Sequence, residues 1–113
     1  MKVLLKNSAL VASLLLCGGL SAAEYTGSGV STVKFITSYN STGDVMFRLE
    51  NPIEACVKGY WMNSSDIGFQ ANMSMLLAAF QTNTNVRIYG LPGQDWPGSS
   101  GTYCKVYSVE YHK

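Results

Sequence analysis

The residues of this chain that could do chemistry are few, and they do not form a catalytic set. The single histidine, His112, is the penultimate residue, where chain ends fray, so it lacks a firm scaffold for acid–base work. No Asp, Glu, His or Cys cluster has the spacing of a calcium or zinc site. Spacing alone leaves open a glycosidase-like carboxyl pair, drawn from Asp44, Glu50, Glu54, Asp66, Asp95 and Glu110. We expect a non-enzymatic protein without a metal or cofactor.

The segment 90–101 is the part of the chain best suited to bind a ligand. It is rich in Gly and Pro, which predicts a loop, and it contains Gln94, Asp95 and Trp96. An indole ring offers an apolar face to the C–H surface of a sugar, while amide and carboxylate groups can hydrogen-bond its hydroxyls. These three residues are therefore candidate sugar-binding residues. The alternative is that Trp96 only caps one end of the hydrophobic core, and Trp61, within a predicted strand, is a core candidate.

The first 23 residues have the pattern of a signal peptide. Two lysines precede an apolar run over 9–20, and small residues at 21–23 suit signal peptidase. A retained membrane anchor is the weaker alternative, because a span needs about 20 apolar residues. A leucine before Cys17 argues against a lipoprotein. We expect residues 24–113 to be one domain that is periplasmic or secreted, with no membrane span after cleavage.

Cys56 and Cys104 are the two cysteines that remain after residue 23. In an oxidising compartment they have one intramolecular pairing available, which predicts a disulfide, and two free thiols are the alternative. The loop-entropy model gives such a bridge about 4 kcal/mol, a large share of the stability of so small a domain.

The charges exclude one class of partner. The chain has eight basic and seven acidic residues, and neither sign forms a run. Nucleic-acid binding normally needs a basic stripe, so we expect no nucleic-acid partner.

The N-glycosylation sequons at Asn40, Asn63 and Asn72 are interpreted as chance matches, because the leader is bacterial in style.

Hydrophobic periodicity predicts five strands and one helix. Residues 30–39 form a predicted strand with Val33 and Phe35 on one face, and 44–50 alternates with one face buried and Asp44 and Met46 on the solvent side. The remaining strands are predicted over 57–62, 86–89 and 102–111. This order matches a five-stranded OB-fold-like Greek-key barrel, mainly β, with the helix between strands three and four. A sandwich with a packed helix is the rival.

The helix is predicted from apolar residues at spacings of three and four, namely Phe69, Met73, Leu76, Leu77 and Phe80. The segment 64–66 can cap its start, and Asn83 or Asn85 can end it. No charged residue lies between Ile67 and Val86. Either a neighbouring subunit covers the outer face, which would include Met75 and Ala79, or the helix is sunk within one subunit.

Several stretches resemble one known family. They are the start Glu24-Tyr25-Thr26-Gly27, a Cys before a Trp-containing strand, the helix with Leu76-Leu77, and above all residues 80–89 with their Val-Arg-Ile strand. Together they are similar to the binding (B) subunits of pertussis-like toxins, a family that includes the subtilase cytotoxin binding subunit.

The resemblance implies an OB-fold subunit in a homo-pentamer, with helices lining a pore, a catalytic partner subunit, and an outer surface that binds host glycans. Family members recognise sialylated sugars through a serine near the first strand, and Ser28 and Ser31 are the nearest candidates here. The leading hypothesis is an exported, non-enzymatic glycan-binding subunit. The alternative is a small exported inhibitor or interaction domain that presents the 90–101 loop, stiffened by Pro92 and Pro97.

Overall fold

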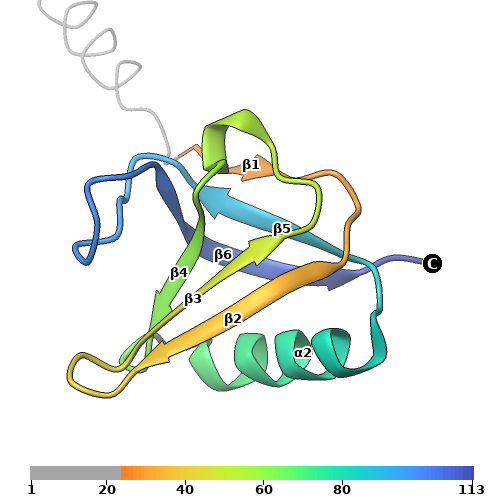
Figure 1. The fold of residues 1–113 in the computed structure, drawn as a ribbon, viewed down its shortest axis with the longest axis horizontal. Helices are drawn as coiled ribbons and strands as arrows, with labels where there is room; N and C mark the ends of the chain where they lie inside the picture. Colours follow the sequence, from red (N-terminus) through yellow and green to blue (C-terminus); the bar gives the residue numbers. More distant parts are fainter. Residues whose placement is uncertain (1–23) are drawn as a thin grey trace, which may run out of the picture.

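The structure, a computed structural model, describes residues 24–113, so the predicted signal peptide and Cys17 lie outside the described residues (Figure 1). Within that range the fold is mainly β with one α-helix, as expected. The elements are β1 (Thr26–Gly27), β2 (Val33–Tyr39), β3 (Asp44–Leu49), the 3-10 turn η1 (Glu54–Cys56), β4 (Gly59–Asn63), α2 (Phe69–Thr82), β5 (Val86–Leu91) and β6 (Tyr103–Tyr111). No helix in this range is long and apolar enough to cross a membrane.

The strands form one mixed sheet with the order β1-β5-β6-β4-β3-β2. The expected meander is present as β2, β3 and β4, whereas β4 and β6 run parallel. The sheet has six strands where five were expected, because the short strand β1 lies before the predicted strand over 30–39. β1 pairs with β5, Ser31 bridges to Val86, and β2 then pairs with β3. The sheet is not closed, since β1 and β2 are its two edges.

The helix ends as predicted but begins differently. Asn83 follows α2 in the left-handed conformation with φ 56°, and its N–H bonds to the carbonyl of Ala79. At the start, Gly68 occupies the cap position without a side-chain hydrogen bond. Asp66 does not cap the helix, because its Oδ2 accepts a hydrogen bond from the backbone N–H of Asn63, 2.8 Å away.

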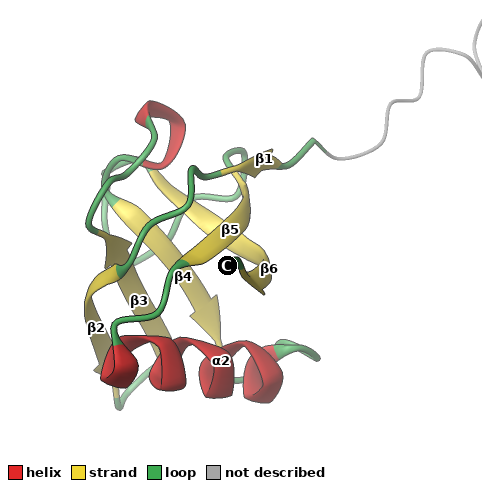
Figure 2. Cartoon of the chain, turned by 90° about the vertical axis from the view of Figure 1, so that its right-hand side faces the viewer, coloured by secondary structure: helices red, strands yellow, loops and turns green. Residues whose placement is uncertain are grey.

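One face of the sheet and the inner face of α2 enclose the apolar interior. We call it the main core: Val33, Val45, Phe47, Leu49, Cys56, Tyr60, Met62, Leu76, Ala79, Val86, Ile88, Cys104, Val106 and Val109. Figure 2 shows α2 lying across one end of the sheet. The predicted disulfide between Cys56 and Cys104 is confirmed, and it ties η1 to β6 across 48 residues of sequence.

The face of α2 that packs on the main core differs from the prediction. Leu76 and Ala79 are fully buried and Met75 packs against them, whereas Leu77 is 44% exposed and Phe80 is also exposed. Successive helical residues are about 100° apart, so Leu77 cannot share the direction of Leu76. The apolar spacing therefore identified the helix but assigned two side chains to the wrong face.

A second apolar cluster lies on the opposite face of the sheet. We call it the loop cluster: the buried residues Met46, Trp96 and Tyr103, with Phe35 and Trp61 packed against them. The prediction that Asp44 and Met46 face solvent is wrong, because the 92–102 loop covers this face of β3. Val33 and Phe35 also lie on different faces, since the register of β2 shifts between them.

Candidate functional site

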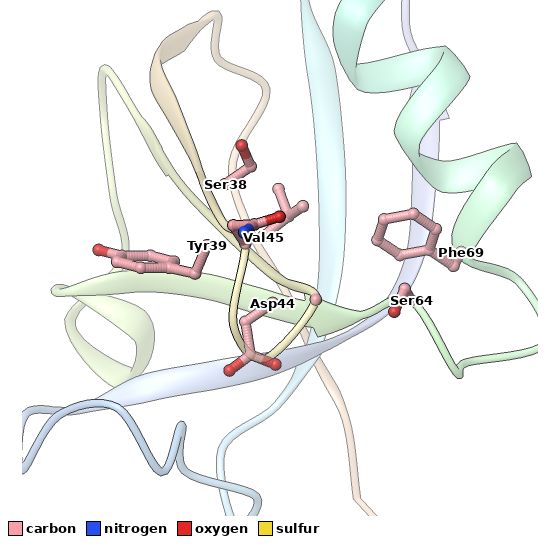
Figure 3. Close-up of a pocket in the computed structure, with 8 residues that line it drawn as sticks. Ser38, Tyr39, Asp44, Val45, Ser64 and Phe69 are labelled. Carbon is pink, nitrogen blue, oxygen red and sulfur yellow. The ribbon is translucent and has the colours of Figure 1, made fainter.

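A surface hollow of about 350 Å³ lies at the end of the β2–β3 hairpin. Its lining residues are Ser38, Tyr39, Asn40, Gly43, Asp44, Val45, Ser64 and Phe69. They come from the hairpin, from the connection after β4 and from the first residue of α2. Figure 3 shows the rings of Tyr39 and Phe69 on either side of the hairpin end, with Val45 between them in this view. The Tyr39 ring points away from Phe69 in this view, so the two aromatic residues lie at opposite sides of the hollow, with small polar residues between them.

The hairpin turn is fixed by local backbone chemistry. Gly43 has φ +74°, a left-handed conformation that glycine adopts without strain, and its N–H bonds to the carbonyl of Tyr39 at 2.9 Å. Its carbonyl accepts a hydrogen bond from the N–H of Ser64, also at 2.9 Å. A side chain at this position would clash with the Ser64 hydroxyl. The turn is thus held directly against the β4–α2 connection, and this contact shapes the hollow.

Asp44 is a buried carboxylate beside the hollow. It is 8% exposed, its Oδ1 accepts a hydrogen bond from Asn63 Nδ2 at 2.8 Å, and its Oδ2 accepts one from Trp96 Nε1 at 3.0 Å. Burial raises the pKa of Asp44, but hydrogen bonds from Asn63, Trp96 and Thr42 and the charge of Lys105 outweigh burial and lower the pKa overall. Asp44 is consequently ionised at neutral pH.

Trp96 is an interior residue of this region. Its side chain is 7% exposed, and its ring lies edge-on to Tyr103 at 5.1 Å and tilted against Tyr39 at 5.2 Å. Gly98 lies so close to the indole that a Cβ there would clash with the ring. The buried indole has little free face for a sugar, and the ring that remains accessible beside it is that of Tyr39, which is 40% exposed.

Gln94 and Asp95 are exposed on the loop next to Trp96. The loop is held at this point because Trp61 Nε1 donates a hydrogen bond to the backbone carbonyl of Gln94 at 2.8 Å. The Lys105 ammonium lies 4.0 Å from the centre of the Trp61 ring and 2.9 Å from Asp66 Oδ1. Two tryptophans therefore tether the loop that carries the predicted sugar-binding residues.

Ser28 and Ser31 are buried and their hydroxyls are used within the fold. The Ser28 hydroxyl accepts a hydrogen bond from the N–H of Ile88 at 2.9 Å, and that of Ser31 accepts one from the N–H of Asn51 at 3.0 Å. Each also donates to the carbonyl of the next residue. None of these bonds reaches the 94–96 segment, so the two groups of predicted residues do not form one site.

Sequence reasoning missed the residues that line the hollow, above all Tyr39, Asn40 and Ser64. The polar turn between two predicted strands was a signal for their location. The alternation of β3 placed Asp44 in solvent, so its burial and its bond to Trp96 could not be anticipated. Among residues 24–113, no group of three or more His, Cys, Asp or Glu could hold a metal ion.

Comparison with known proteins yields no match to this chain among family models, curated proteins or solved structures. Its function has to be argued from its own residues and geometry.

Proposed function

We propose that the chain is an exported, non-enzymatic glycan-binding subunit with an OB-fold-like domain, and that the hollow at the β2–β3 turn is its glycan site. The observation that carries the site is the exposed Tyr39 ring at the edge of a hollow that is also lined by the polar residues Ser38, Asn40 and Ser64. An aromatic face with a few convergent polar groups is the usual composition of a sugar site.

Three features support the OB-fold-like topology. The helix lies between the third meander strand and the last two strands, β4 and β6 are parallel neighbours, and residues 26–31 pair with β5 before β2 pairs with β3. In this topology one interrupted first strand contacts both ends of the sheet. The disulfide is compatible with an oxidising compartment, and hence with export.

A glycan array with Tyr39→Ala tests the proposal. We expect the protein recovered from cells that express the full chain to bind a defined set of glycans. Tyr39→Ala should weaken binding about tenfold or more, because it removes the stacking face. Tyr39→Phe should retain much of the affinity, and Val57→Ala, at an exposed position away from the hollow, should retain all of it. Trp96→Ala is a poor test here, since it removes a buried side chain. Full binding by Tyr39→Ala would contradict the site, and no binding to any glycan would contradict the function.

Assembly with further copies of the chain is the second part of the proposal. The outer side of α2 has no charged residue, and Leu77 and Phe80 are exposed on it together with Ile67 before the helix. A second copy would cover these apolar side chains. We propose a homo-pentamer that carries a catalytic partner subunit, as the toxin-like pattern implies. Light scattering should give five times the subunit mass, and Leu77→Glu should lower it, whereas a monomer at micromolar concentration would refute the assembly.

The alternative function, presentation of a rigid loop to a protein partner, is favoured by one observation. Residues 93–95 and 97–100 are exposed, while Trp96 and the Gln94 carbonyl are anchored by hydrogen bonds. Such preorganisation lowers the entropy lost on binding. A pull-down that recovers a protein with the native chain but not with Asp95→Ala would favour this function. Capture that is unchanged by Asp95→Ala would count against it.

A further inference from the structure

Three tyrosines form a surface cluster on the outer face of β1, β5 and β6. Tyr25 directly precedes β1, Tyr89 lies in β5 and Tyr107 lies in β6. The rings of Tyr25 and Tyr107 are stacked with centroids 4.3 Å apart and planes 7° apart, and Tyr89 meets Tyr25 edge-on at 6.2 Å. We call these three residues the tyrosine surface.

The backbone is arranged to make room for these rings. The pairing of β5 with β6 shifts between Tyr89 and Gly90, so Tyr107 is the extra residue of a bulge and has no partner opposite it. A bulge of this kind re-aims a side chain. On β1, Gly27 lies opposite Tyr89, and a Cβ there would lie 2.8 Å from a carbon of the Tyr89 ring. The rings are therefore held in place before any ligand arrives.

We propose that the tyrosine surface is a second saccharide-binding surface, which stacks on the C–H face of a neutral sugar ring; this inference rests on the proposed glycan-binding function. Tyr25 and Tyr107 are 52% and 55% exposed, so each presents ring carbons together with a hydroxyl at the solvent boundary. This pairing of an apolar face with a polar rim matches a pyranose ring. The rings also lose little conformational freedom on binding, because they already pack on one another.

The size of the surface favours a small ligand over a second copy of the chain. Two half-exposed tyrosine side chains and the edge of a third offer on the order of 250 Å². A stable protein interface buries about 800 Å² on each partner. One sugar ring, by contrast, is about as large as one aromatic ring, so the surface can accommodate it.

The charges around the surface favour a neutral ligand. Arg87 lies two residues before Tyr89 on the same face of β5, and Glu110 is its cross-strand partner on β6. Glu110 also contacts His112, with 2.9 Å between Oε2 and Nε2. A positive and a negative side chain lie side by side, so an anionic group on a ligand would have no net electrostatic attraction to this surface.

The tyrosine surface is separate from the hollow. β1 lies at one end of the domain and the β2–β3 turn at the other, in both views (Figures 1 and 2). One subunit would then contact glycan at two places. The two contacts can be removed independently, and this makes the inference testable apart from the first site.

The test is an NMR titration of the protein, purified after expression of residues 1–113, with lactose, maltose and chitobiose, each added to millimolar concentration. We expect saturable shifts at Tyr25, Tyr89 and Tyr107 for at least one sugar. Tyr107→Ala should lower the affinity measured at the surface about tenfold, while Tyr107→Phe, which keeps the ring, should lower it by no more than about threefold. Tyr39→Ala should leave these shifts unchanged. Far-ultraviolet circular dichroism identifies any variant that fails to fold.

The outcomes separate this inference from the proposed function. Shifts confined to the hollow would overturn the tyrosine surface and leave the glycan-binding function standing. Shifts confined to the tyrosine surface would support it and refute the hollow. No shift with any of these sugars, or tyrosine shifts that depend on protein concentration and not on sugar, would overturn the second surface. A glycan array that is positive in the same preparation would still uphold the function.

Discussion

The main core and the loop cluster lie on opposite faces of β3 and β4, and they are held by different interactions. The main core contains only apolar side chains, a disulfide and Tyr60, and α2 covers it. The loop cluster has three buried residues, and it depends on a hydrogen bond from Trp96 to the ionised Asp44. The hollow borders both regions, because its lining includes Val45 of the main core and Asp44, which bonds to Trp96 of the loop cluster. Both faces of the sheet therefore contribute to the candidate site.

Removing the disulfide should have the largest effect and should act on the main core. The double variant Cys56→Ser/Cys104→Ser loses a constraint across 48 residues, and we expect its free energy of unfolding to fall by about 4 kcal/mol. Urea denaturation followed by circular dichroism measures this change. Equal stability of the oxidised protein and the double variant would show that the main core does not depend on the bridge.

Two neighbouring leucines of α2, Leu76 and Leu77, test which side of the helix faces the main core. Leu76 is fully buried, so Leu76→Ala should lower the free energy of unfolding by about 3 kcal/mol. Leu77→Ala is the matched control and should change it by less than about 1 kcal/mol. Both values come from urea denaturation at a protein concentration where the chain is in one oligomeric state. Similar losses for the two variants would contradict the orientation of the helix.

Trp96 and Trp61 allow a corresponding comparison in the loop cluster. Trp96→Phe leaves Asp44 without one of its donors, and we expect a loss of about 2 kcal/mol, because hydrogen bonds to charged groups are strong. Trp61→Phe removes a bond to an exposed carbonyl and should lose about 0.5 kcal/mol. If the two variants proved equally stable, Asp44 would not be the anchor of the loop.

Acid should weaken the loop cluster through Asp44. Its pKa in the folded protein lies below the ordinary value of 3.8, so the ionised carboxylate stabilises the fold above that pH. This contribution is lost as the pH falls below about 4 through the folded-state pKa. The Asp44→Asn variant has no carboxylate at this position to titrate. Its free energy of unfolding should therefore fall less than that of the native chain between about pH 5 and pH 2.5. Parallel curves of stability against pH for the two proteins would contradict this role.

The sequence predicted the helix, the meander and the disulfide because each depends on a local pattern or on the number of cysteines. It did not predict the burial of side chains that are covered by a segment distant in the sequence. The alternation of β3 indicated a solvent-facing side, but the 92–102 loop covers Met46 and Asp44. The pairing register of β2 shifts by one residue between Val33 and Phe35, which places their side chains on different faces of the sheet. No pattern of residue types predicts such a shift. Trp96 had two predicted roles, sugar binding and capping of the hydrophobic core, and its burial in the loop cluster agrees with the second.

Hydrogen exchange at the Trp96 indole tests the division between the two regions most directly. In the folded protein, the indole N–H bonded to Asp44 should exchange with a lower free energy of opening than the buried backbone N–H of Ile88 in the main core. Asp44→Asn should reduce the first value more than the second. If both N–H groups exchange with the same free energy of opening, and Asp44→Asn lowers the two values equally, the loop cluster and the main core are one cooperative unit. The division of the molecule into two regions would then be wrong.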